Sequence, residues 1–112
     1  KVIVIDALKA SKTERLVKTI QITNKGINPG SGINNNRGEI SKKTMNTEVV
    51  SIGVPTVVDI KTILKSILKE EVTLENNLIL TPTDIDFQIE KLSELLSQSI
   101  NKTLHKKLYP TK

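Results

Sequence analysis

The order of apolar and polar residues predicts short strands in the first half of the chain. The uninterrupted β-branched run at residues 2–5 is typical of a strand buried on both faces, as in a parallel sheet, and we expect it to end at Asp6. Apolar and polar residues alternate over 19–23, which predicts a strand with one polar face. Residues 49–54 form a second buried-strand candidate. We expect Pro55 to end it, because proline lacks the N–H that sheet pairing uses.

The second half of the chain has the periodicity of two amphipathic helices. Thr56 and Asp59 are typical of a helix start because their side chains can accept hydrogen bonds from free backbone N–H groups, and apolar residues at helical spacing continue to residue 68. A second start at residues 81–84 precedes a helix of about six turns over 85–104. Its apolar repeat is Ile85, Ile89, Leu92, Leu96, Ile100 and Leu104.

The connections differ in character. Residues 7–17 have room for a turn or two of helix, 39–45 for a short helix, and 70–77 form a polar linker. Residues 24–38 hold four of the five glycines and three consecutive asparagines, so we expect a loop with unusual backbone conformations.

Length and composition indicate a folded chain and exclude several chemistries. A chain of 112 residues with 37% hydrophobic and 26% charged residues is long enough for one core. We expect residues 1–77 to form part of an α/β domain and 78–112 to add a helix that packs on it. The absence of Cys excludes disulfides, thiolate metal sites and thiol nucleophiles. No apolar run reaches the ~18 residues of a membrane-spanning helix, so we expect no membrane contact.

The net charge of +5 does not point to nucleic acid. Nine basic and three acidic residues lie in 1–45, so the basicity is concentrated there. All but two of the 17 basic residues are Lys, and aromatic residues make up 2% of the chain. Base readout favours Arg and single-strand binding favours aromatic side chains. We therefore expect no direct contact with nucleic acid.

The glycine-rich loop does not match a phosphate-binding motif. It lacks Gly-Lys-Ser/Thr, and Gly30-Ser31-Gly32 lacks the third glycine of a dinucleotide fingerprint. Two interpretations stay open: a turn-rich connection, or a loop in which Gly30, Ser31 and Gly32 contact a substrate.

His105 is the only histidine, and its place at a helix end beside lysines is typical of a helix-dipole partner or a surface residue. Without a second His or any Cys, a transition-metal site would need mostly carboxylates, and no serine triad can be assembled. We expect no metal and no cofactor.

Asp6 is the strongest candidate for chemistry. Catalytic groups gather at the carboxyl ends of strands in open α/β sheets, whereas Asp59 and Asp84 have capping explanations. Hydrolysis by carboxylates uses a pair, one to activate water and one to protonate the leaving group. No second carboxylate in this chain has comparable standing. Either Asp6 is structural, or its partner lies elsewhere.

Four motifs in sequence resemble the C-terminal half of the germination protease family, also called spore protease. They are VIVIDAL at 2–8, TIQI at 19–22, GINPGSG at 26–32 and IGVPTVVD at 52–59. Leu-Thr-Pro at 80–82, followed by the long helix that ends at Leu104-His105, is similar to the tail of that family.

The resemblance implies an endopeptidase that degrades small acid-soluble spore proteins during germination in the cytoplasm of the forespore and spore core. It implies a zymogen, a tetramer, and a three-layer α/β/α sandwich similar to hydrogenase maturation proteases. Of the two catalytic aspartates that it implies, one falls on Asp6 and the other belongs to an N-terminal half. The chain starts with Lys1 and with a strand already under way, so we expect that half to lie upstream and the isolated chain to be inactive.

The sequence departs from the family pattern at two places. Asn34-Asn35-Asn36 replaces a shorter stretch that contains glycine, and Lys9 and Lys12 follow Asp6 where the family is less charged. Both bear on loop conformation and substrate fit. Two other functions stay open: a metal-dependent peptidase with a cation at Asp6, and a folded interaction module without catalysis.

Overall fold

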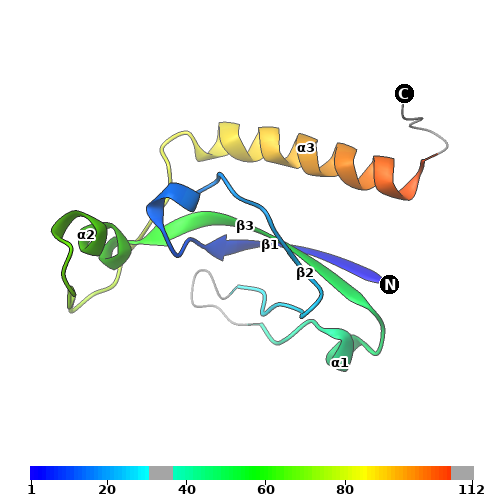
Figure 1. Cartoon of the computed structure of the whole chain (residues 1–112), viewed down its shortest axis with the longest axis horizontal. Helices are drawn as coiled ribbons and strands as arrows, with labels where there is room; N and C mark the ends of the chain where they lie inside the picture. The colour runs from blue at the N-terminus through cyan, green and yellow to red at the C-terminus, as the bar shows by residue number, and fades with distance from the viewer. Residues whose placement is uncertain (31–36, 107–112) are drawn as a thin grey trace. The chain divides into compact units, whose positions relative to one another are not determined.

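The computed structural model describes residues 1–30 and 37–106. Its two units are Lys1–Pro82, which holds the sheet, and Thr83–Lys112, which holds the last helix (Figure 1). The elements are β1 (Val2–Lys9), a 3-10 helix η1 (Thr13–Arg15), β2 (Gln21–Thr23), α1 (Lys42–Met45), β3 (Val49–Asp59), α2 (Ile60–Leu68), β4 (Ile79–Leu80) and α3 (Ile85–Leu104). The predicted α/β class is confirmed.

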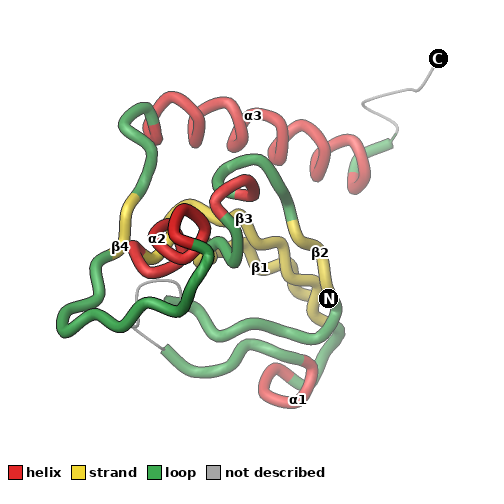
Figure 2. The backbone as a smooth tube through the Cα atoms, turned by 60° about the vertical axis from the view of Figure 1, so that its left-hand side comes forward, coloured by secondary structure: helices red, strands yellow, loops and turns green. Residues whose placement is uncertain are grey.

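β3 is the centre of a mixed four-stranded sheet. It pairs with β1 in parallel and with β2 and β4 antiparallel, which gives the order β1-β3-β2 with β4 at the far end of β3 (Figure 2). Gly53 of β3 lies between Asp6 of β1 and Gln21 of β2. The predicted strand over 19–23 is present in shorter form as β2.

Two expectations for the first strand are wrong. β1 extends to Lys9, so Asp6 lies inside the strand and not at its end. Exposure also alternates along β1: Ile3 is 41% and Ile5 54% exposed, whereas Val4 and Asp6 are better covered. Successive side chains of a strand point to opposite faces, and in the described residues only one face of β1 is well covered.

The expected end of the strand at Pro55 is also wrong. β3 continues to Asp59, and α2 begins at Ile60 in place of residue 56. The register shifts here, because Leu8 pairs with Pro55 while Lys9 pairs with Val57. Proline is tolerated in a sheet at such an irregularity, where its missing N–H costs no ladder bond.

The core of the first unit surrounds β3. Val49 and Val58 are each 1% exposed, and Ala10 and Val17 are also buried. The Ala10 N–H donates to the Val57 carbonyl at 2.8 Å, and the Val17 N–H donates to the Pro55 carbonyl at 2.7 Å. The segment that follows β1 is therefore bonded to the C-terminal part of β3.

The helices agree with the sequence pattern except in their caps. The predicted short helix is α1, where Ser41 and Thr44 form a capping box. The predicted long helix is α3, with the bounds expected. Asp84 makes no cap bond and instead accepts a hydrogen bond from the side chain of Gln88 at 2.6 Å. Within the described part of the chain, no helix has the length and apolar character needed to cross a membrane.

Candidate functional site

Asp6 faces a cavity of about 210 Å³ between the sheet and the glycine-rich loop. The cavity is lined by Asp6, Ala7, Leu8, Pro29, Gly30, Arg37, Thr56 and Val57. The Oδ2 atom of Asp6 is buried and has no hydrogen-bond partner among the described residues. An unpaired buried carboxylate oxygen is costly for a fold, so its retention on a residue that lines a cavity favours a function in binding or chemistry.

The two arms of the glycine-rich loop are held side by side (Figure 2). Ile27 and Ile40 exchange backbone hydrogen bonds of 2.9 and 2.8 Å. Nearer the cavity, the Arg37 N–H donates to the Pro29 carbonyl at 3.0 Å. These bonds place both arms of the loop at the wall of the cavity, although they are separated in sequence.

Glycine is required at position 26, at the start of the first arm of the loop. Gly26 has a φ of +88°, and a Cβ there would lie 2.6 Å from the Ile40 carbonyl oxygen and 2.6 Å from the Ser41 Cβ. Both a left-handed backbone and the absence of a side chain are therefore needed for the two arms to approach.

The cavity brings together some of the residues predicted from the sequence. Asp6 and Gly30 line it, whereas Ser31 and Gly32 lie outside the described residues. Arg37 was not predicted as a site residue. A basic residue that closes a glycine-rich loop, and one of only two arginines, is the signal that would have found it.

Asp6 and Arg37 are the two charged residues that line the cavity, and the other walls are mostly apolar. None of the ion pairs within the described residues joins them or involves Arg37. The cavity therefore presents a carboxylate and a guanidinium that are not neutralised by each other.

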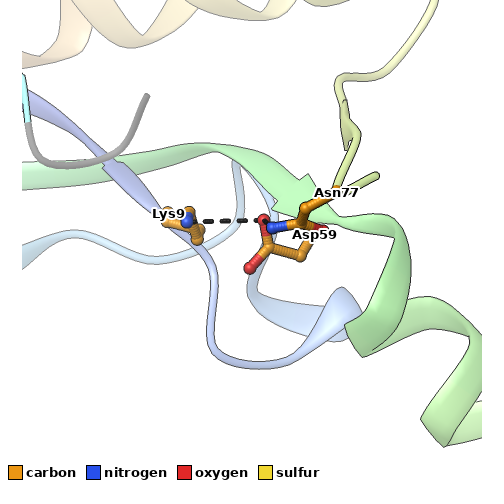
Figure 3. Close-up of polar contacts among 3 residues, drawn as sticks. All are labelled: Lys9, Asp59 and Asn77. Carbon is orange, nitrogen blue, oxygen red and sulfur yellow. Dashed lines mark hydrogen bonds and ion pairs between the residues drawn. The ribbon is translucent and has the colours of Figure 1, made fainter. Parts of the chain in front are cut away.

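Asp59 does not belong to the cavity, and its expected role as a helix cap is wrong. It makes no cap bond. Its Oδ1 atom lies 3.4 Å from the Lys9 Nζ and accepts a hydrogen bond of 3.3 Å from the Asn77 side chain (Figure 3). The side chains of Lys9 and Asp59 are 27% and 19% exposed, so the pair is partly shielded from water. Lys9, which departs from the family pattern, is therefore engaged with Asp59.

No group of three or more His, Cys, Asp and Glu side chains comes together within residues 1–30 and 37–106 in a way that could hold a metal.

The first 70 residues of the chain match a family model described as germination protease. The chain belongs to the germination protease family. All residues that line the cavity fall within the matched residues.

Curated germination proteases resemble the chain over most of its length. The protein from Caldanaerobacter subterraneus subsp. tengcongensis is 37% identical over 137 residues, which covers 92% of this chain and 42% of that protein. The protein from Clostridium perfringens is 34% identical over 134 residues, with 89% and 41% covered. A Geobacillus germination protease is 62% identical over 58 residues, which is 52% of this chain. The chain thus spans about two fifths of the length of the first two relatives.

Proposed function

We propose that this chain is part of an aspartic-type endopeptidase in which Asp6 is one of two catalytic aspartates. The observation that carries the proposal is the buried, unpaired Oδ2 atom of Asp6 in a cavity within the family match. A structural carboxylate inside a strand would be expected to have hydrogen-bond donors around it.

The chemistry follows from the needs of amide hydrolysis. The Asp6 carboxylate takes a proton from water, whose oxygen bonds to the scissile carbonyl carbon. The second carboxyl group protonates the departing nitrogen as the C–N bond breaks. Among the described residues, Asp6 is the only carboxylate that lines the cavity, so in this proposal the second one comes from another part of the intact protease. The greater length of the relatives supports this assignment.

We propose that the remaining part of the protease, an N-terminal half, covers the exposed side of the sheet and completes a three-layer α/β/α sandwich. The exposure of Ile3 and Ile5 supports this, because uninterrupted apolar strands are usually covered on both faces. In the same proposal, α3 adds its apolar stripe to the same domain.

The substrates that we propose are the small acid-soluble spore proteins, cleaved during germination in the spore core, with the intact protease as a tetramer made from a zymogen. The relatives are germination proteases, which supports a role in germination, and the family resemblance of the sequence motifs supports the rest. In the same proposal, Gly30 contacts the substrate backbone, and its position in the wall of the cavity beside Asp6 supports this.

The test is an Asp6→Asn variant of the longest natural protein that contains this chain. Its cleavage of small acid-soluble spore proteins should fall by roughly three orders of magnitude or more, since the base is lost. The matched control is Asp59→Asn, which removes a carboxylate outside the cavity and should leave cleavage largely intact. An active Asp6→Asn enzyme would contradict the proposal, and activity abolished by chelators would favour a metal-dependent peptidase instead.

The same account makes the 112-residue chain inactive by itself. Cleavage of spore proteins by the isolated chain would show that a second carboxylate is not needed. Stable self-association without any dependence of function on Asp6 would instead favour an interaction module.

A further inference from the structure

A backbone hydrogen bond holds Arg37 at the wall of the cavity, so its side chain is not needed to position it. Its N–H donates to the Pro29 carbonyl at 3.0 Å, and the Ile27–Ile40 pair holds the same two arms. The residue is exposed, so a ligand in the cavity can reach it from solvent. Any substitution except proline keeps the backbone bond, which makes the side chain testable separately from the loop.

The chemistry of a guanidinium narrows what Arg37 can do beside Asp6. Arginine stays protonated in proteins, so it cannot act as the acid or the base of hydrolysis. Its N–H donors suit an oxygen that carries negative charge. Within the described residues, no carboxylate forms an ion pair with the Arg37 side chain.

The proposed hydrolysis produces such an oxygen. When water adds to the scissile carbonyl carbon and Asp6 takes the proton, the electron pair of the C=O bond moves to the carbonyl oxygen. That oxygen is negative until the C–N bond breaks and the carbonyl reforms. Neither carboxyl group supplies a positive charge to it, and the remaining walls of the cavity are uncharged.

We infer that Arg37 is a further catalytic residue, which stabilises the negative charge on the carbonyl oxygen while Asp6 activates water. This inference rests on the proposed function. Asp6 and Arg37 line one cavity of about 210 Å³, so a single peptide group can lie between them with water on the Asp6 side. A donor placed where charge develops acts mainly in the transition state, so it should affect kcat more than KM.

The experiment compares Arg37→Gln, Arg37→Lys and Arg15→Gln in the longest natural protein that contains this chain, with a spore protein as substrate. Arg15 is the matched control because it is the other arginine, is exposed in η1 and does not line the cavity. Arg37→Gln should lower kcat by roughly 10²–10³-fold with little change in KM, as loss of an oxyanion donor does. Arg37→Lys should lose less, and added guanidinium ion should restore part of the activity of Arg37→Gln.

Two results would overturn the inference: unchanged kcat in Arg37→Gln, or a loss that appears only in KM, which would make Arg37 a substrate-binding residue. The Asp6→Asn variant distinguishes failure of the proposed function from failure of the role assigned to Arg37. If Asp6→Asn is active, the proposed function fails. If Asp6→Asn is inactive while Arg37→Gln is fully active, the role of Arg37 alone fails.

Discussion

Leu8 occupies the space into which a side chain at position 53 would project. A Cβ at Gly53 would lie 2.8 Å from the Leu8 Cγ, and Leu8 is also a wall of the cavity that contains Asp6. The smallest residue of the central strand and a large residue of the neighbouring strand therefore fit together. The shape of the candidate site depends on this fit.

We expect Gly53→Ala to destabilise the chain by about 1–3 kcal/mol, because the added Cβ would overlap the Leu8 side chain, which must then shift. Urea unfolding measures the change. In a Leu8→Ala background the same substitution should cost much less, since the clashing atoms are gone. Equal costs in the two backgrounds would show that the penalty comes from the backbone and not from Leu8.

The glycine-rich loop offers a comparison between two glycines with positive φ. Gly26→Ala should lose about 1 kcal/mol from backbone strain and more from its clash with the Ile40 carbonyl. Gly38 has a φ of +96°, and a Cβ there would meet nothing within 4 Å, so Gly38→Ala should lose only what the strain costs. The difference in the free energy of unfolding between the two variants isolates the clash. Identical losses would show that the arms are not held as close as the geometry requires.

The long helix α3 and the positions of the strands β1 and β3 could be predicted because each depends on a local pattern, whereas the burial of β1 could not. The end of β3 could not, because Pro55 is tolerated only through a register shift against β1, which depends on a partner strand about 45 residues earlier in the chain. Asp6 was chosen as a candidate because its strand was expected to end there; the strand continues to Lys9, and the observation that supports Asp6 is its place in the wall of a cavity.

Arg37 shows a different limit. The glycine-rich stretch before it is only a general signal, and Arg37 lines the same cavity as Asp6 because backbone hydrogen bonds between Ile27 and Ile40 hold the two arms of the loop together. Likewise, the capping roles expected for Asp59 and Asp84 are locally sound, but other side chains take up both carboxylates. Local rules identify which groups are available, and packing decides their partners.

The Lys9–Asp59 pair should contribute measurably to stability because both side chains are partly shielded. We expect the coupling energy in a double-mutant cycle with Lys9→Met and Asp59→Asn to be about 1 kcal/mol, read from urea unfolding. Asn77→Ala should lower stability less, since it removes one hydrogen bond of 3.3 Å. A coupling energy near zero would mean that Lys9 is simply a solvated residue.

The Lys42–Glu48 pair gives the fold a weak dependence on acid pH. The hydrogen bond from Lys42, at 2.6 Å, lowers the pKa of the Glu48 carboxyl from its usual 4.5. A carboxyl group whose pKa is lowered by folding adds stability above its unfolded pKa, and this is lost as pH falls through the folded value. The stability difference between wild type and Glu48→Gln should therefore be present at pH 7, absent near pH 2, and reduced by salt. Glu75→Gln, an exposed carboxylate outside the ion pairs described, should show no such difference.

Unfolding of the isolated chain can test, without an activity assay, whether the Asp6 carboxylate stabilises the fold or costs it stability. A structural carboxylate is held by donors and loses stability when replaced, whereas a carboxylate kept for chemistry costs the fold desolvation. Because its Oδ2 atom is buried and unpaired, we expect Asp6→Asn to raise the free energy of unfolding by about 1 kcal/mol. The control is Ser51→Ala, which removes the other buried, unpaired side-chain oxygen in the described residues and should be neutral or slightly stabilising. If Asp6→Asn unfolds at lower urea while Ser51→Ala does not, Asp6 stabilises the strand, and the case for a catalytic carboxylate loses its main support.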